Sequence, residues 1–287
     1  MLHAEPLTIE LSPYPHFVRP DTLAADDIDR FLSVWPPREA FTLEKTGNLT
    51  HSVNAAPSDP VVWREQLAGC VQELTRTTVA AFAPWLVARF GSDLTSLETI
   101  TLLMEADPSY SGLPIHNHHW HSPNWVATAL VYLDPVAPGY AGTVLNGYGP
   151  ADDPEACAQV FARTDMWGAD PDFSIDRVMD YQQGSLFAFL DGPMSYHSTL
   201  AAAPDAESGR RVLRMHIAAP WDLCEAVYGV SEAEYCALHP RGEPATDPRV
   251  LEWVRRDLAE QNEQVAMSAA AARDWARSLD IRVPLPA

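Results

Sequence analysis

The sequence predicts a mainly β protein of the sandwich or barrel class, with helices flanking the β core at both ends. Several short β-rich runs lie between about residues 97 and 219, and turn residues rather than helical segments separate them. The 25 prolines in 287 residues interrupt helices and argue against a helical bundle. Because barrels and sandwiches of this length fold as one unit, we expect residues 1–287 to form a single domain.

Residues 1–95 are predicted to form a helical N-terminal support for the β core. Apolar residues recur at helical spacing over 24–34, which predicts a short helix. Asp59 and Pro60 then provide an N-cap and a proline suited to a first helical position, and a longer apolar period follows them. Pro84 is expected to kink or end this second helix.

Residues 96–220 are predicted to form the β core. Its expected strands are Thr99–Met104, Trp125–Leu133, Gly142–Leu145, Gly184–Leu190 and Arg211–Ala218. Residues 149–178 are rich in Asp, Pro and Ala with little periodicity, so we expect an insertion there of the kind that becomes a lid.

Residues 221–287 are predicted to be C-terminal helices. Asp247 and Pro248 repeat the Asp-Pro helix start, and apolar residues then follow at roughly helical intervals. These helices are expected to pack on the core or on a second subunit, which makes them a candidate surface for a homodimer.

The charge of the chain limits its partners. Lys and Arg total 19 against 39 Asp and Glu, a formal net charge of −20. Such a surface repels phosphate groups, so we expect neither nucleic acid nor an anionic membrane as a partner. There is no apolar run of the roughly 20 residues that a membrane helix needs, and no signal peptide is recognisable, so we expect a cytoplasmic protein.

Four histidines within six residues predict a metal site. In a strand, residues two apart share a face, so His116 and His118 form one pair and His119 and His121 the other. Imidazole is the commonest metal ligand in proteins, and either pair could hold one ion. A third ligand is expected from elsewhere, and His197 is the best candidate because it follows a second predicted strand and a Gly-Pro turn.

Several short motifs of this chain, including those that contain His116, His118 and His197, resemble motifs of the Fe(II)- and 2-oxoglutarate-dependent oxygenases and follow one another in the same order. The family has a PxHxD/E stretch, a TxLLYL strand, a GDxxxF strand, a distal histidine and a GxR strand. The corresponding stretches here are Pro114–His118, Thr128–Leu133, Gly184–Phe187, Tyr196–Ser198 and Gly209–Leu213, within about residues 97–219.

The resemblance implies a double-stranded β-helix, or jelly roll, over residues 96–220. It also implies Fe(II) held by His116, His118 and His197, with 2-oxoglutarate as cosubstrate and no catalytic residue beyond the metal ligands. The expected reaction is hydroxylation or another oxidation of a small molecule, such as an amino acid or a natural-product-like compound.

His118 departs from the family pattern, because it stands where the family has a carboxylate. A third imidazole preserves the geometry of the metal site but removes one negative charge. Three histidines are also typical of cupin dioxygenases, which act without 2-oxoglutarate, although the glutamate of the cupin pattern is missing after His118. A non-catalytic metal- or ligand-binding β-helix protein is a further alternative.

The arginine that would bind the distal carboxylate of 2-oxoglutarate is left open between two residues. The resemblance favours Arg211. Strand parity favours Arg214, because Arg211 shares a face with apolar Leu213 whereas Arg214 shares the other face with His216. Arg210 is interpreted as a surface residue.

Three further residues are weaker candidates for the substrate pocket. Trp120 and Trp125 could form a wall of it, although packing in the core is the more frequent role of such side chains. Asn146 is a candidate polar donor, or a plain strand residue.

Overall fold

The structure is a computed structural model. It describes residues 7–44, 48–52, 61–106, 110, 112–119, 122–135, 141–150, 153–160, 171–199, 210–238, 247–266 and 274.

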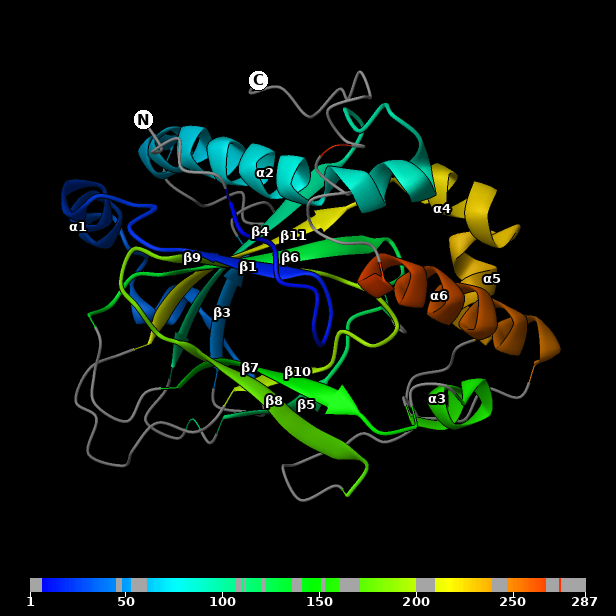
Figure 1. Ribbon diagram of the computed structural model, residues 1–287. Helices are drawn as coiled ribbons and strands as arrows, with labels where there is room; N and C mark the ends of the chain where they lie inside the picture. Colours follow the sequence, from blue (N-terminus) through cyan, green and yellow to red (C-terminus); the bar gives the residue numbers. More distant parts are fainter. Residues whose placement is uncertain are drawn as a thin grey trace.

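Two antiparallel sheets face each other (Figure 1). The larger sheet contains, in spatial order, β1 (His16–Arg19), β9 (Leu186–Leu190), β6 (Trp125–Tyr132), β11 (Arg211–Ala218), β4 (Glu98–Ala106), β3 (Asn48–Ser52) and β2 (Thr42–Leu43). The smaller sheet contains β5 (Leu113–His116), β10 (His197–Thr199), β7 (Ala141–Tyr148) and β8 (Phe173–Asp180).

The chain crosses between the sheets in the manner of a jelly roll. From β4 to β11 it passes from the larger to the smaller sheet and back, and only β7 and β8 are consecutive strands in one sheet. The order β9-β6-β11-β4 therefore faces the order β5-β10-β7-β8, which is the topology of a double-stranded β-helix. The predicted fold class is confirmed.

Alternation along the strands divides the side chains of the larger sheet between two cores. On β6, Ala127 and Val131 face outward into the larger apolar cluster, whereas Leu130 and Tyr132 face inward, between the sheets. On β11, Leu213 belongs to the outer cluster and its neighbour Val212 to the inner one. The inner face is therefore the one that can present polar groups to a ligand between the sheets.

Helix α2 (Val61–Phe90) covers the outer face of the larger sheet (Figure 1). Phe82 is fully buried, and its ring lies 5.5 Å from that of Phe17 on β1. The helix continues through Pro84 and ends before Gly91, which has a φ of +83° and donates its N–H to the Val87 carbonyl. Pro84 was predicted to kink or end the helix, and it does not end it.

Three C-terminal helices pack beside the open end of the sandwich. They are α4 (Trp221–Tyr228), α5 (Glu232–Leu238) and α6 (Pro248–Ala266), so the helix predicted to start at Pro248 is confirmed. The ring of Tyr235 lies 5.0 Å from Tyr228 and 5.3 Å from Trp253, which joins the three helices. Association of two chains through these helices stays a prediction.

Two regions differ from the prediction. The N-terminal support contains α1 (Ala25–Ser33), as expected for 24–34, but also β1, β2 and β3, which extend the larger sheet. The predicted insertion at 149–178 contains α3 (Pro154–Val160) and then the first part of β8, which pairs with β7. Strand β8 lies at a sheet edge, and its Ile175 is 57% exposed, so it lacks the alternation of a half-buried strand.

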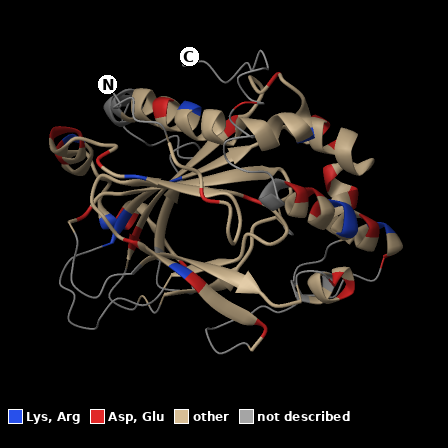
Figure 2. Cartoon of the chain, in the orientation of Figure 1, with Lys and Arg blue, Asp and Glu red and all other residues tan. Residues whose placement is uncertain are grey.

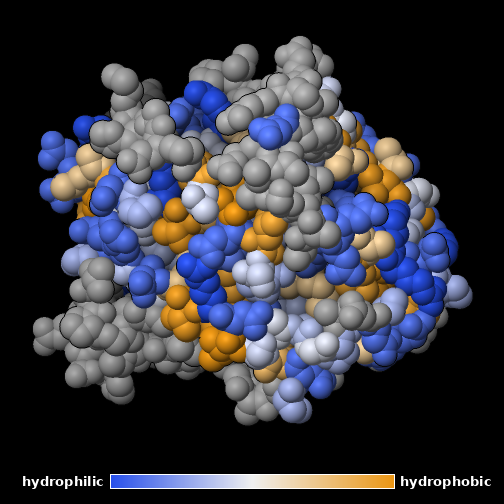
Figure 3. Space-filling model, viewed as in Figure 1, coloured by the Kyte–Doolittle hydropathy of each residue, from blue (hydrophilic) through white to orange (hydrophobic). Residues whose placement is uncertain are grey.

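Charged residues gather on the helices and loops rather than on the central strands. Figure 2 shows acidic residues along α2 and α6. In Figure 3, viewed from the same side, hydrophobic residues at the surface are separated by hydrophilic ones. Among the described residues, no helix has both the length and the apolar character needed to cross a membrane.

Candidate metal centre

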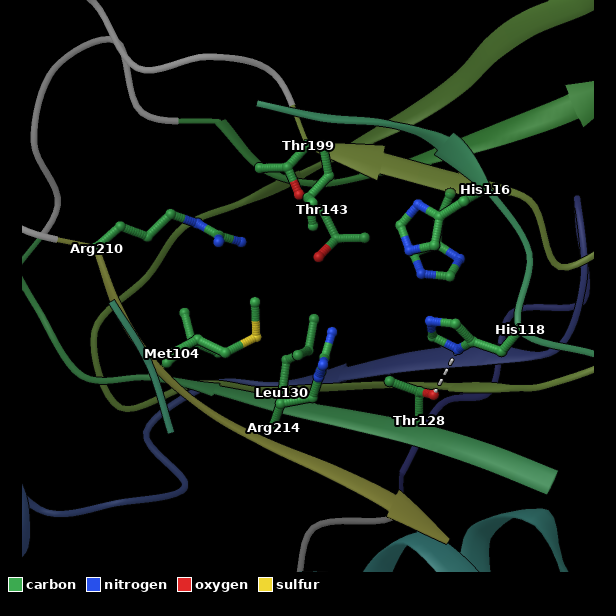
Figure 4. Close-up of a pocket in the computed structure, with 12 residues that line it drawn as sticks. Met104, His116, His118, Thr128, Leu130, Thr143, Thr199, Arg210 and Arg214 are labelled. Atoms are coloured by element: carbon green, nitrogen blue, oxygen red, sulfur yellow. Dashed lines mark hydrogen bonds between the residues drawn. The ribbon is translucent and has the colours of Figure 1, made fainter. Parts of the chain in front are cut away.

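Three histidines meet between the two sheets. His116 is the last residue of β5, His118 follows it by two, and His197 is the first residue of β10, paired with His116 in the ladder. One ring nitrogen from each lies within 4.8 Å of the others. The ring of His116 lies 4.1 Å from that of His197 and 5.3 Å from that of His118 (Figure 4). This spacing is compatible with one metal ion.

Hydrogen bonds set which ring nitrogen of each histidine is available. His116 Nδ1 lies 2.8 Å from the Pro114 carbonyl, and His197 Nδ1 lies 2.9 Å from the Ser195 carbonyl. Because a carbonyl oxygen only accepts, each Nδ1 carries the proton and each Nε2 keeps its lone pair. Metal-binding histidines are oriented in this way by their outer nitrogen.

His118 is oriented by a buried carboxylate. Its Nδ1 donates to Asp191 Oδ1 at 3.1 Å, and Thr128 Oγ1 donates to Asp191 Oδ2 at 2.6 Å. Asp191 is itself buried, just after β9. A negative charge is therefore present beside the candidate ligand set, one imidazole away from the position that a metal would take.

The surroundings of His197 keep it neutral. Burial, followed by the neighbouring His116 and His118, holds the pKa of His197 well below its ordinary value. Only the neutral imidazole has a lone pair for a metal, so a lowered pKa favours metal binding over protonation.

A second histidine group overlaps the first. His118, Asp191 and His216 also bring ligand atoms within 4.8 Å of one another. His216 Nδ1 lies 3.0 Å from Thr128 Oγ1, and its ring stacks on Trp125 at 3.9 Å. Since Thr128 already donates to Asp191, His216 Nδ1 is the donor to Thr128. His216 thus extends the polar network that holds Asp191.

Asn117 connects the two segments that carry the histidines. Its side-chain amide donates to the carbonyls of Gly192 and Pro193 at 2.9 and 3.0 Å, and its Oδ1 accepts the backbone N–H of His119 at 2.7 Å. The loop before His197 is therefore tied to the segment that contains His116 and His118.

Of the alternative pair, His119 and His121, the described residue His119 is not part of either group of candidate ligands. His119 is fully buried, and its Nε2 lies 2.9 Å from Asp257 Oδ2 on α6. His121 lies outside the described residues. The structure thus brings together His116, His118 and His197, and their role as ligands stays a prediction.

A hollow extends from the histidines along the inner face of β11. The space inside it, counted out to its open mouth and including solvent, is about 360 Å³. Its lining includes Met104, Leu113, His116, His118, Thr128, Leu130, Thr143, His197, Thr199, Arg210, Val212 and Arg214 (Figure 4). The wall combines apolar side chains with hydroxyl groups and two arginines.

The three arginines of β11 and its start have different surroundings. Arg211 lies outside this lining and binds Asp134, with its Nε 2.9 Å from Asp134 Oδ1. Arg210 and Arg214 point into the hollow. Strand parity explains the division, since residues 210, 212, 214 and 216 share the inner face. Of the two predicted arginines, Arg214 lines the hollow and Arg211 does not. Arg210, interpreted above as a surface residue, is instead buried in the hollow.

The weaker pocket candidates have structural contacts. Trp125 stacks on His216 and lies edge-on to the His118 ring at 5.4 Å, beside the hollow rather than in its lining. Asn146 accepts a hydrogen bond from Ser198 at 2.9 Å, which joins β7 to β10. Trp120 lies outside the described residues.

Three residues of this region were missed as functional candidates in the sequence. Asp191 resembles an ordinary turn residue in an Asp-Gly-Pro string, and Thr128 an ordinary strand residue. Arg210 shares its face with Arg214 and His216, so the parity that identified Arg214 could also have identified it.

Comparison with known proteins finds no matching family model and no matching curated sequence. Among solved structures, the chain is similar to a Pseudomonas putida prolyl-4-hydroxylase at 14% identity, over 71% of this chain and 92% of that one, with a TM-score of 0.47. It is also similar to SnoN, a non-haem α-ketoglutarate-dependent epimerase from nogalamycin biosynthesis, at 14% identity, over 82% and 91%, with a TM-score of 0.46. A Trichoplax adhaerens prolyl hydroxylase, in complex with a hypoxia-inducible-factor peptide, matches at 11% identity, over 73% and 86%, with a TM-score of 0.42.

The strand order of the chain itself establishes the double-stranded β-helix. Within that fold, His116, His118 and His197 converge between the sheets, as the sequence motifs predicted. The resemblance to the Fe(II)- and 2-oxoglutarate-dependent oxygenases is thus shown in the fold and in a set of side chains that could hold a metal.

Proposed function

We propose that this protein is a non-haem iron oxygenase that uses 2-oxoglutarate to oxidise a small molecule. The observation that carries the proposal is that one hollow is lined both by three oriented imidazoles and by two guanidinium groups. The imidazoles suit a divalent metal, and the guanidinium groups suit the carboxylates of a cosubstrate.

The donor set fits Fe(II), with His116, His118 and His197 as the ligands. Fe(II) accepts imidazole as well as carboxylate ligands, and three protein ligands leave positions for a cosubstrate and oxygen. Bound iron would supply oxygen activation coupled to the conversion of 2-oxoglutarate into succinate and CO₂. Asp191 would offset part of the metal charge through His118.

The chain's own part is to bind, orient and exclude water. The distal carboxylate of 2-oxoglutarate would bind at one of the two arginines that line the hollow, Arg210 or Arg214, since a guanidinium group matches a carboxylate with two parallel hydrogen bonds. Apolar Met104, Leu130 and Val212 line the same hollow and limit the access of water to it.

The test is the formation of succinate from 2-oxoglutarate by protein loaded with Fe(II) in air. We expect slow succinate formation by the wild type without a primary substrate, and none by His197→Ala. Absence of succinate formation and of 2-oxoglutarate binding by an iron-loaded wild type would reject the proposal.

A second candidate is a three-histidine dioxygenase that does not use 2-oxoglutarate. It is favoured by one observation, the absence of a carboxylate from the ligand group His116, His118 and His197. Such an enzyme would consume oxygen with its own substrate and show no requirement for 2-oxoglutarate. A protein that binds metal but consumes no oxygen under either condition would instead be a non-catalytic binding protein.

A further inference from the structure

Arg210 and Arg214 form no hydrogen bond and no ion pair within the described part of the chain. Arg210 is only 4% exposed, and its Nε, like that of Arg214, is buried without a hydrogen-bond partner. The guanidinium of Arg210 lies 5.8 Å from the ring of Tyr110 and 6.0 Å from that of Tyr181, contacts that do not neutralise its charge. Buried charges are normally paired, and within the described residues these two guanidinium groups have no anion, so we assign their counter-charges to a ligand.

A guanidinium group is a cation at neutral pH, and the burial of Arg214 does not change this. Burial, together with the nearby charge of Arg210, lowers the pKa of Arg214 to about 10, while Glu44 and Asp191 oppose the shift. Glu44 is exposed and accepts a hydrogen bond from Thr50 at 3.2 Å, and it forms no ion pair with Arg214. Among the described residues, the hollow therefore holds two cationic groups with no carboxylate in contact.

The proposed cosubstrate cannot neutralise both arginines. The two charges of Fe(II) would be balanced by the metal-side carboxylate of 2-oxoglutarate and by Asp191 behind His118. The distal carboxylate then balances one guanidinium group. The charge of the second guanidinium is left over, in a site where an unpaired charge is costly.

The two arginines occupy different parts of the hollow. His216 marks the metal end of β11, because its ring lies 4.9 Å from that of His118. At about 3.3 Å per strand residue, the Arg214 backbone is about 7 Å from that of His216 and the Arg210 backbone about 20 Å. Figure 4 shows Arg214 between the histidines and Arg210, which lies at the opposite end. Arg210 is buried, whereas Arg214 is partly exposed.

We propose that the hollow binds two anions at once, and that the primary substrate is a small monocarboxylic acid. This inference rests on the proposed function. A 2-oxoglutarate molecule held by the metal extends its distal carboxylate away from the histidines, toward Arg210. Arg214, beside the histidines and closer to solvent, receives the carboxylate of the substrate. One surplus charge suits one carboxylate better than a doubly charged phosphate ester.

The test measures ligand binding to protein loaded with Mn(II), so that no turnover intervenes. The probes are 2-oxoglutarate and a series of acids from acetate to 3-phenylpropanoate, each compared with its neutral primary amide. In the wild type with saturating 2-oxoglutarate, we expect the acids to raise the melting temperature and the amides to have no effect.

Two variants separate the roles of the arginines. Arg210→Gln should weaken 2-oxoglutarate binding by about tenfold or more, as expected for loss of a hydrogen-bonded charge pair. Arg214→Gln should leave that affinity within about threefold but abolish the difference between acids and amides. Arg214→Lys keeps the charge and should retain part of the difference.

Three results would overturn the inference. They are equal responses of the wild type to acids and amides, an equal loss of 2-oxoglutarate affinity in both glutamine variants, or an acid preference that survives Arg214→Gln. A wild type that prefers acids but does not bind 2-oxoglutarate would contradict the proposed function instead, because the anion site would then exist without the cosubstrate.

Discussion

Asp191 places a negative charge one imidazole away from the candidate metal position. Its carboxylate accepts hydrogen bonds from His118 Nδ1 and Thr128 Oγ1, and it is buried. A carboxylate bound to the outer nitrogen of a ligand histidine fixes the ring and makes its inner nitrogen more basic. The charge absent from position 118, where the family pattern has Asp or Glu, is thus partly supplied from position 191.

Replacing Asp191 by Asn should weaken Fe(II) binding by about 10- to 100-fold, the usual effect of losing an outer partner of a ligand histidine. The amide oxygen still accepts a hydrogen bond, but the charge is gone. Metal titration measures the effect. Asp134→Asn is the matched control, since Asp134 is a buried carboxylate bound to Arg211 outside the hollow. Equal metal affinity in Asp191→Asn and the wild type would contradict this role.

Substitutions at the histidines test the ligand set directly. His197→Ala should lose nearly all bound Fe(II), and His118→Ala should weaken binding. His118→Asp should keep the metal, because Fe(II) accepts carboxylate and imidazole alike. Iron content per chain after desalting measures each outcome. Wild-type iron content in His118→Ala would mean that His118 is a neighbour of the metal and not a ligand.

Residue types and spacing predicted the three histidines, because an HxH pair and a later histidine lie next to recognisable strands. They could not predict Asp191 or Thr128, whose contact with His118 depends on three-dimensional packing across the larger sheet. Parity on β11 separated Arg211 from Arg214, since the inner and outer faces of a strand alternate. The same parity predicts that Arg210 lies on the inner face, but Arg210 was interpreted from the sequence as a surface residue.

Helix α6 supports the histidine segment through a buried ionic network. Asp257 on α6 accepts hydrogen bonds from His119 Nε2 at 2.9 Å and from Tyr228 at 3.1 Å, and it is paired with Arg256. Arg89 of α2 donates to Tyr228. The chain next to His118 is therefore anchored to three helices, and this anchor limits its movement.

Asp257→Asn should lower the free energy of unfolding by about 1.5–3 kcal/mol, because it removes hydrogen bonds to a buried charged group and the carboxylate that pairs with Arg256. Chemical denaturation measures the change. Glu252→Gln on the exposed side of α6 is the control, with an expected change within about 0.5 kcal/mol. Similar stability of the two variants would show that the network does not anchor α6.

The same residue predicts a dependence of stability on pH. Burial alone would raise the pKa of Asp257, but the hydrogen bond from His119 and the charge of Arg89 outweigh it and hold the pKa below its ordinary value. Since the native pKa is depressed, the stabilisation is complete above about pH 4 and is lost as the pH falls below it. Denaturation between pH 7 and 3 should therefore show wild type and Asp257→Asn converging at low pH. A constant difference would contradict the assignment.

Long apolar elements were predicted more accurately than short or edge elements. Helix α2 and strands β4, β6 and β11 are long and rich in apolar residues, so their runs can be recognised in the sequence. Strand β1 has four residues, and β8 exposes its apolar side chains at the sheet edge, so neither carries a clear signal. The pairing of β8 with β7 supplies hydrogen bonds that no local pattern reveals.

At the scale of the whole molecule, the candidate metal centre joins the two sheets. His116 and His197 belong to the smaller sheet, whereas Thr128 belongs to the larger one and Asp191 follows its strand β9. His118 connects the two sets through its hydrogen bond to Asp191. A metal bound by all three histidines would therefore oppose separation of the sheets at this end of the sandwich.

Metal binding should for this reason raise the melting temperature of the whole protein. An ion that binds only the folded chain, at about 100 times its dissociation constant, adds about 2.7 kcal/mol. For a chain of this size each kcal/mol raises the midpoint by about 2–4 °C, so we expect a shift of about 5–10 °C. Thermal denaturation with and without Mn(II) measures it, and His197→Ala should show no shift. A shift that is equal in His197→Ala and the wild type would place the metal elsewhere on the acidic surface. No shift in either protein would contradict a site that joins the two sheets.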